Sequence, residues 1–295
     1  MANLLPLSPS FLEGLRRLAI VARRRAGGVN AGERTTVRKG QGVEFADHRG
    51  YTPGDDPRFL DWSAYARIGR PVVKEFLEES DLALTVFVDA SASMGFGTPR
   101  RLDVACTLAS VFCRIALARH DRAGIGVIRG DQVQFLPPQR SQGQVLWIEE
   151  ALAKAEAEGK TALATALARH FATTKAEGVV VVISDLYDPK TPLALVDCLV
   201  HHGVDARILM LSDDEELRLL PGGPVDIVDS ETGETIRMLI TPEVAQELAR
   251  SIAAYRAKAC AYAANKGIPC TVVDCHRPVT DIVTELVARG EVLHA

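Results

Sequence analysis

Several features that would place a protein in a special class are missing from this sequence. Its six cysteines form no CxxC pair and no cluster with histidine at zinc-site spacing, so neither a disulfide scaffold nor a zinc domain is expected. No uncharged run approaches the roughly 20 apolar residues that span a bilayer. The first residues also lack the basic stretch and continuous apolar segment of a secretory signal. We therefore expect a cytoplasmic protein with reduced thiols and no integral membrane segment.

A strong charge of either sign is also missing. The formal net charge is −4, which gives no overall reason to expect binding to nucleic acid or to a membrane. Apolar residues recur at helical spacing from Phe11 to Ala22, and the opposite face of this predicted helix carries arginines. We expect that basic face to be solvated, with the helix packed on its own domain, and contact with an anionic membrane or a partner is the alternative. Because no aromatic residues are interleaved, we expect no nucleic-acid binding.

The residues that are present predict an α/β fold. Hydrophobic residues make up 47% of the 295 residues and charged residues 24%, which are ordinary values for a globular protein. Residues 82–88 and 179–183 are short, nearly continuous apolar runs rich in β-branched residues, typical of strands buried on both faces. Helical patterns alternate with such runs. This rhythm predicts a doubly wound, mostly parallel sheet with helices on both faces.

The pattern also predicts a division of the chain. Residues 1–80 contain the N-terminal helix and an irregular, charge-rich block, which we expect to pack on the main domain of residues 81–295. Residues 213–240 leave the βα rhythm and hold a turn signal at 231–234, which predicts a hairpin insertion. The expected helices are 59–68, 101–119, 144–158, 161–174, 191–202, 242–266 and 279–288, and the expected strands are 82–88, 123–128, 132–136, 179–183, 205–211 and 270–273.

Oxygen-bearing side chains follow two of the predicted strands. The first buried strand runs into Asp89-x-Ser91-x-Ser93, and the strand at 179–183 is followed by Asp185. Thr161 stands at the expected start of a helix, after a glycine break. Ligands of open parallel sheets bind beyond the C-terminal ends of the strands, so we expect these five residues to converge there.

The chemistry of this set points to a hard cation. Two carboxylates and three hydroxyls, with no nitrogen or sulfur, suit Mg²⁺, and Mn²⁺ is also possible. So few formal charges leave the ion electropositive, which favours an incoming carboxylate from another protein. The set includes no poised general base, which argues against hydrolysis. The alternative is that Ser91 and Ser93 only cap the following helix and Asp89 is a hydrogen-bonded acid at a strand end.

In order and spacing, these residues resemble the metal-ion-dependent adhesion site of von Willebrand factor A-type (vWA) domains. The resemblance implies that Ser91, Ser93 and Thr161 ligate the ion directly. It also implies that Asp89 and Asp185 act largely through water. Together these features predict a protein-binding metal site.

A longer pattern upstream is more specific. Residues 42–58, 61–67 and 73–79 resemble the family catalogued as domain of unknown function 58, whose members join such a block to a vWA domain. The likeness covers residues 35–195 well and the C-terminal third loosely. Members are commonly encoded beside MoxR-type AAA+ ATPases, and the pair is associated with assembling or activating other proteins. The resemblance implies a non-enzymatic adaptor for such an ATPase. The charged block at 42–79 is either structural or a docking surface.

An enzyme is the competing interpretation, in the form of a metal-dependent hydrolase or phosphatase of the haloacid-dehalogenase type. Those enzymes place a second aspartate two residues after the first, where this sequence has Ser91. The Gly159-Lys160-Thr161 segment is similar to the end of a P-loop, but Lys154 stands where the first glycine belongs. Neither serine lies in a GxSxG motif. We therefore expect no enzymatic activity.

Overall fold

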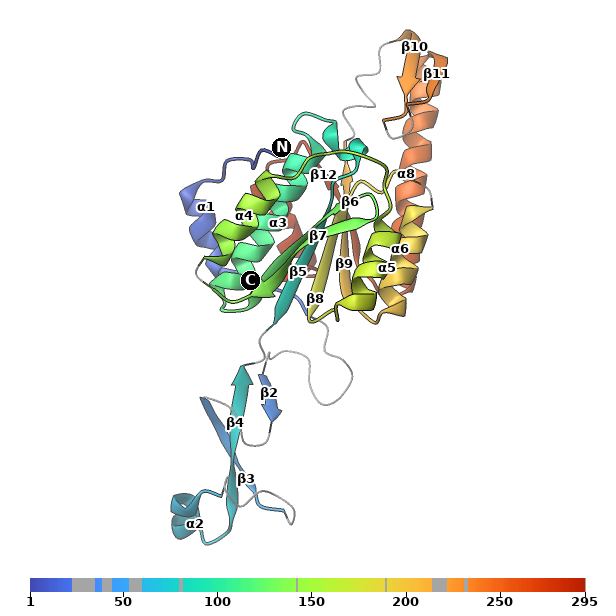
Figure 1. The fold of residues 1–295 in the computed structure, drawn as a ribbon. Coiled ribbons are helices and arrows are strands. Elements are labelled where there is room, and N and C mark those ends of the chain that lie inside the picture. The colour runs from blue at the N-terminus through green and yellow to red at the C-terminus, as the bar shows by residue number, and fades with distance from the viewer. Residues whose placement is uncertain are drawn as a thin grey trace. The chain divides into compact units, whose positions relative to one another are not determined.

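The computed structural model describes residues 1–22, 35–38, 44–52, 60–79, 82–141, 143–188, 190–213, 222–230 and 233–294. The chain divides into two compact units (Figure 1). Unit 1 comprises Met1–Arg23 and Leu82–Ala295, and unit 2 comprises Arg24–Asp81. The sequence suggested a single boundary near residue 80, but the N-terminal segment belongs to unit 1. The reason is that β1 (Ala19–Ile20) pairs with β13 (Leu293–His294) near the other end of the chain.

The centre of unit 1 is a six-stranded sheet with the strand order β12-β9-β8-β5-β6-β7. All neighbours are parallel except β6 and β7, which form an antiparallel hairpin at one edge. The chain builds outward from β5 in one direction and from β8 in the other, so the predicted doubly wound sheet is confirmed. The strands are β5 (Ala83–Asp89), β6 (Arg122–Arg129), β7 (Gln132–Gln139), β8 (Val179–Ser184), β9 (Asp205–Ser212) and β12 (Cys270–Asp274).

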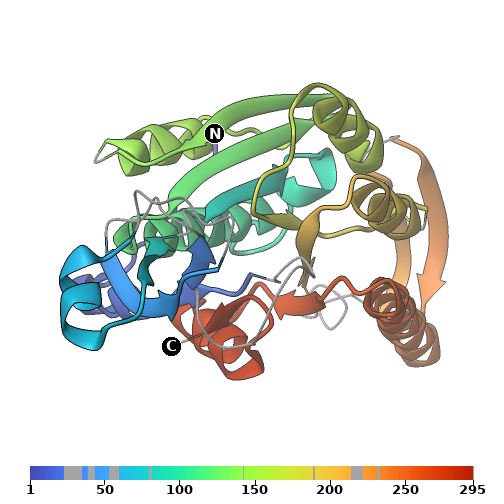
Figure 2. The ribbon, with the colours of Figure 1, turned by 90° about the horizontal axis from the view of Figure 1, so that it is seen from below.

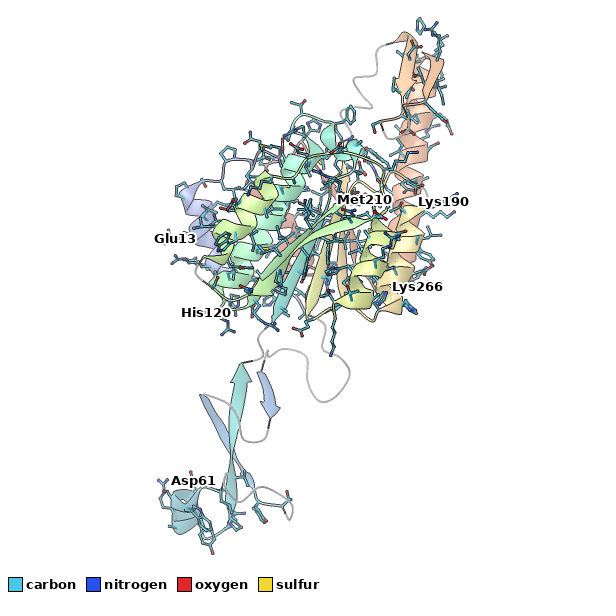
Figure 3. All side chains as sticks on the ribbon, viewed as in Figure 1. Glu13, Asp61, His120, Lys190, Met210 and Lys266 are labelled. Atoms are coloured by element: carbon cyan, nitrogen blue, oxygen red, sulfur yellow. The ribbon has the colours of Figure 1, made fainter. Side chains whose placement is uncertain are left out.

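Two hydrophobic cores lie on the two faces of this sheet. On β8, Val179 and Val181 join the first core, while Val180 and Val182 join the second. Each fully buried valine contributes about 1.5–3 kcal/mol, and covering both faces is why the strand sequence is continuously apolar. Figure 2 shows the helices as layers on opposite sides of the sheet. In Figure 3, side chains fill the space between the sheet and the helices, and Met210 on β9 is fully buried there.

The helices of unit 1 divide between those cores. The first core is covered by α1 (Pro9–Gly14), α3 (Arg101–Ala118), α4 (Gln144–Ala153) and α9 (Val279–Arg289). The second core is covered by α5 (Leu163–Thr173), α6 (Thr191–His201) and α8 (Pro242–Asn265). No helix in the described part of the chain is long and apolar enough to cross a membrane, and this includes the 24-residue α8.

The N-terminal helix is shorter than its hydrophobic periodicity predicts. After α1, a 3₁₀ turn covers Leu15–Arg17, and the chain then enters β1. The prediction of a helix through Ala22 is therefore wrong. Strand pairing with β13 outweighs the local helical pattern, because backbone pairing and burial of Ile20 are tertiary gains that periodicity does not report. The arginines at 23–25 lie outside the described residues.

Within the insertion predicted at residues 213–240, the described residues form an antiparallel hairpin. Its strands are β10 (Gly223–Val228) and β11 (Thr235–Ile240), and they pair with each other alone. Near the turn, the backbone N–H of Asp229 donates to the carbonyl of Glu234 at 2.8 Å. The hairpin prediction is confirmed. The Thr241 hydroxyl then accepts from the backbone N–H of Val244 at 3.3 Å and caps α8.

Unit 2 contains a three-stranded antiparallel sheet with the order β2-β4-β3. Its strands are β2 (Thr35–Arg38), β3 (Glu44–Gly50) and β4 (Val72–Glu79). The prediction of an irregular block within residues 1–80 is therefore wrong for β2 and β3. Both strands pair with β4 and not with each other, so their partner is remote in sequence and no local alternation predicts them.

The short helix of unit 2 confirms the prediction at residues 59–68, with a later start. This helix, α2, spans Trp62–Ile68. The Asp61 carboxylate accepts hydrogen bonds from the backbone N–H groups of Ser63 at 2.9 Å and Ala64 at 3.0 Å, which satisfies the free donors of the first turn. Gly69 ends the helix in a left-handed conformation with φ of 75°.

The approach of β8 to β5 allows a test with two glycines. Gly178 has a φ of +67°, and a Cβ atom there would lie 2.0 Å from the carbonyl oxygen of Ala83. Gly130 has a φ of +58°, but a Cβ atom there would meet no atom within 4 Å. Alanine is strained at both positions by about 1–3 kcal/mol. Gly178→Ala must also separate the strands, so we expect it to lower the free energy of unfolding by a further ~1–3 kcal/mol.

Urea unfolding of the two alanine variants measures this difference. Gly130→Ala is the matched control, because it imposes the same backbone strain without the steric overlap. Equal losses in the two variants would contradict the close approach of Gly178 to Ala83.

Candidate functional site

The first loop of the site begins where β5 ends. Asp89 is the last residue of β5, and the 3₁₀ turn η3 (Ala92–Gly95) begins three residues later. Ser91 stands at the N-cap position of this turn, but its side chain makes no capping hydrogen bond. Instead, the hydroxyl oxygens of Ser91 and Ser93 lie 3.1 Å apart, and both residues are buried. Capping therefore does not account for Ser91.

Asp89 is buried, with only 2% of its surface exposed, and two hydrogen bonds hold it. Its Oδ1 accepts from the backbone N–H of Ser91 at 2.9 Å, and its Oδ2 accepts from the Ser184 hydroxyl at 2.7 Å. The pKa of the Asp89 carboxyl is raised to about 7. Burial is the main cause and the charge of the nearby Asp185 is the second, while the hydrogen bonds to Asp89 partly oppose the rise. The two carboxylates are close enough to repel each other.

The second loop follows β8. Asp185 is the first residue after the strand and is almost fully buried. Its Oδ1 accepts from the backbone N–H of Tyr187 at 3.4 Å. Ser184 joins the two loops, because its hydroxyl donates to Asp89 and accepts from the backbone N–H of Leu186 at 3.0 Å. Leu186 has a φ of 51°, an uncommon left-handed value for leucine that produces a sharp turn.

The third segment connects α4 to α5 and runs beside the first loop. The backbone N–H of Glu158 donates to the carbonyl of Ala90 at 2.9 Å, and that of Ala92 donates to the carbonyl of Gly159 at 2.9 Å. Thr161 follows and is half-buried. The prediction that Thr161 begins a helix is wrong by two residues, because α5 starts at residue 163. Hydrogen bonds to the first loop hold this segment outside the helix.

The structure therefore brings Asp89, Ser91, Ser93 and Asp185 to one edge of the sheet. Ser91 contacts both Asp89 and Ser93, Asp185 lies within electrostatic reach of Asp89, and the segment before Thr161 is bonded to the first loop. Sequence reasoning missed Ser184, although a hydroxyl at the end of a buried strand was a usable signal. It also missed Arg101, whose side chain contacts Ser93 and Tyr187 but which in sequence is an ordinary charged residue at a helix start.

The donor set fits a hard divalent cation. Within the described ranges, no group of three or more histidine, cysteine, aspartate or glutamate side chains could hold a metal ion. A cation at this edge must therefore draw on hydroxyl oxygens and water as well as on the two carboxylates. Mg²⁺ keeps several waters and prefers oxygen ligands, so the residues present suit it.

A family model described as "Protein of unknown function DUF58" matches residues 47–258. This chain belongs to the DUF58 family. The match runs from unit 2 through β5 and β8, so it includes every residue of the candidate site. The resemblance to this family is confirmed, and the doubly wound sheet is the vWA-like architecture expected of it.

Two mycobacterial relatives match most of this chain. They are the uncharacterized protein Mb1516 of Mycobacterium bovis and the uncharacterized protein Rv1480 of Mycobacterium tuberculosis. Each is 28% identical over 257 residues, which cover 84% of this chain and 80% of the relative. The similarity therefore extends well beyond the candidate site.

Two solved structures are similar at low sequence identity. The vWA domain of SpRpn10 is 12% identical with a TM-score of 0.38, and the alignment covers 69% of this chain and 94% of that domain. The pilus adhesin SpaC from Lactobacillus rhamnosus GG is 10% identical with a TM-score of 0.42, and the alignment covers 71% of this chain and 30% of the adhesin. The fold assignment rests on the strand order described above.

Asp89 makes the metal-free protein sensitive to pH. Its pKa is 3.8 when unperturbed and about 7 in the folded protein, so the folded state binds the proton more tightly. The stabilising contribution of that proton is fully present below pH 3.8 and is lost as the pH rises through 7. In the presence of chelator we expect Asp89→Asn to be more stable than the wild type at pH 8, by about 1–4 kcal/mol.

Denaturant unfolding at pH 8 and pH 5 checks this expectation. The advantage of Asp89→Asn should shrink at the lower pH, because the wild-type carboxyl is then protonated. A variant less stable than the wild type at pH 8 would contradict the raised pKa.

Proposed function

We propose that this chain is a non-enzymatic protein-binding module whose partner contacts a bound divalent cation, Mg²⁺ or Mn²⁺. The proposed ligands are Asp89, Ser91, Ser93, Thr161 and Asp185. The observation that carries the proposal is the meeting of two buried carboxylates and two buried hydroxyls beyond the C-terminal ends of β5 and β8. These ends lie side by side at one end of the sheet, because the two strands pair in parallel (Figure 1).

The place of the site in the fold supports binding of a ligand from outside. The order of the strands reverses between β5 and β8, and in open α/β sheets a crevice forms at that reversal. When bound, the cation supplies an electropositive contact for a carboxylate oxygen of the partner. Among the five proposed ligands, only Asp89 and Asp185 carry formal negative charge. The protein therefore does not over-compensate the positive charge of the cation, which can still attract an acidic side chain of the partner.

The pKa of Asp89 lies in the range of a general base, contrary to the expectation that the set holds none, but the contacts around Asp89 support positioning over proton transfer. Both of its oxygens already accept hydrogen bonds, one from Ser91 and one from Ser184. The position where a haloacid-dehalogenase-type phosphatase has its general acid is Ser91, whose hydroxyl contacts that of Ser93. These contacts support a binding function for the loop.

The partner that we propose is a MoxR-type AAA+ ATPase, with this chain acting as an adaptor in the assembly or activation of other proteins. Membership of the DUF58 family supports this part of the proposal, because the resemblance to that family implies genes encoded beside those of such ATPases. The acidic residue that completes the cation's coordination would belong to the ATPase.

The cation ligands are tested by matched threonine substitutions. Thr161→Val removes one hydroxyl oxygen at nearly constant volume, so we expect the affinity for Mg²⁺ or Mn²⁺ to fall by at least about 10-fold. Asp89→Ala should abolish binding. Thr165 is exposed and lines an open groove between α5 and α6, so Thr165→Val should leave the affinity unchanged.

Isothermal titration calorimetry of the folded variants measures these affinities. Circular dichroism confirms that each variant retains its structure. Loss of binding in Thr165→Val, with normal binding in Thr161→Val, would show that Thr161 is assigned wrongly.

The partner is tested with the purified MoxR-type ATPase of the native organism. We expect wild-type protein to bind the ATPase in Mg²⁺ and to release it in chelator, because the proposed contact passes through the cation. The chelator also removes Mg²⁺ from the ATPase, so it does not act on this chain alone. Asp89→Ala removes only the cation site of this chain and is therefore the specific comparison. It should bind at least about 10-fold more weakly, since a buried charge-assisted contact is worth 1.5–3 kcal/mol.

Biolayer interferometry with immobilised ATPase measures all three arms. Equal affinity of the wild type and Asp89→Ala would exclude the cation from this contact. Rapid turnover of a small phosphoester by the wild type, lost in Asp89→Ala, would overturn the non-enzymatic proposal itself.

A further inference from the structure

Among the described residues of unit 1, Arg101 and Arg207 are the most deeply buried arginines, with exposed fractions of 2% and 1%. Burying a guanidinium costs several kcal/mol of hydration, so its partners indicate what it holds in place. Arg207 donates to the carbonyls of Glu291 at 2.7 Å and Val21 at 3.0 Å, which fixes the segments beside β1 and β13. Arg101, at the start of α3, contacts the two loops of the candidate site instead.

The first contact of Arg101 is with the serine loop. Its Nη1 donates to the carbonyl oxygen of Ser93 at 3.0 Å. Its backbone N–H donates to the carbonyl of Phe96 at 3.0 Å, and the backbone N–H of Phe96 donates to Ser93 at 3.4 Å. Both the side chain and the backbone of Arg101 therefore hold the turn that carries the Ser93 hydroxyl.

The second contact of Arg101 is with the aspartate loop. Its Nη2 donates to the hydroxyl of Tyr187 at 3.2 Å, and its guanidinium carbon lies 4.9 Å from the centre of the Tyr187 ring. The backbone N–H of Tyr187 in turn donates to Asp185. A continuous path thus runs from Ser93 through Arg101 and Tyr187 to Asp185.

This path complements the bond between Ser184 and Asp89. That bond links the strand ends, whereas the arginine links the loops beyond them. Only a planar guanidinium can direct separate N–H groups at a carbonyl and a phenol while stacking on the phenol ring. A lysine ammonium carries its three donors on a single nitrogen, so it cannot reproduce this planar fork or stack on the ring in the same way.

We propose that Arg101 is a positioning residue for the cation site, which sets the separation of the Ser93 and Asp185 loops by clamping Tyr187. This inference rests on the proposed function. Arg101 donates hydrogen bonds only and is no ligand of the cation, so its effect passes through the geometry of residues that are. Its own charge repels a cation and acts in the opposite direction.

Because positioning and charge repulsion change the cation affinity in opposite directions, the direction of the change in a variant distinguishes them. If only the charge of Arg101 mattered, Arg101→Met would tighten cation binding, because it removes a repelling charge. Positioning predicts that Arg101→Met weakens binding. Arg101→Lys keeps the charge but loses the fork, and we expect its affinity for Mn²⁺ or Mg²⁺ to fall roughly 10–100-fold. Tyr187→Phe removes only the hydroxyl and should weaken binding less, because its ring still lies against the guanidinium.

The matched control is Arg207→Lys, which disturbs an equally buried arginine away from the site. We expect it to lower the thermal stability of the metal-free protein and to leave cation affinity unchanged. Calorimetric titration with Mn²⁺ and with Mg²⁺ gives the affinities, and thermal unfolding in chelator gives the stability of each variant. Arg101→Lys should differ from the control by losing affinity.

Each failure has a distinct result. If Arg101→Lys loses stability but keeps full affinity, as expected of Arg207→Lys, Arg101 is only structural and this inference fails while the proposed function stands. Tighter binding in Arg101→Met also overturns it. If the wild type binds neither ion, the proposed function fails and the inference falls with it. Tyr187 is 37% exposed, so we expect Tyr187→Phe to keep the fold. If the cation affinity of this variant equals that of the wild type, Tyr187 does not position the site and the inference fails. This result is decisive even if the arginine variants do not fold.

Discussion

The parallel pairing of β5 with β8 is the constraint on which the rest of the structure depends. Its register sets Val88 opposite Ile183, so the next residues, Asp89 and Ser184, meet at the strand ends with a hydrogen bond of 2.7 Å. A slip of one residue would turn every side chain of one strand to the other face. Burial of both faces in two cores makes such a slip costly. Packing that stabilises the domain thereby also aligns the two loops.

The same alignment brings two carboxylates, Asp89 and Asp185, into a buried position at the strand ends. Two carboxylates are buried close together, and the pKa of Asp89 is raised to about 7 by burial and by Asp185. Ordinary packing would favour apolar side chains there. Shifted pKa values of this kind concentrate at functional sites. Ser184 and Arg101 supply polar contacts to the two loops there.

Much of the candidate site could be predicted from sequence because its residues stand at the ends of predictable strands. Asp89 and Asp185 follow apolar runs whose strand character is unambiguous. Thr161 lies outside its helix, since helix boundaries respond to neighbouring backbone as well as to local propensity. Arg101 gave no local signal of its role, because Tyr187, its partner, is 86 positions away in the chain.

By itself, the sequence determined the α/β class, the order of strands and helices from β5 to α9, and the oxygen-rich chemistry of the two loops. Hydrophobic periodicity and turn residues are local properties, so they can be read directly. The tertiary structure alone decided the pairing of β1 with β13, the strands β2 and β3, and the bonds from Ser184 and Arg101. Those features depend on contacts between residues far apart in the chain, whose free energy no local pattern contains.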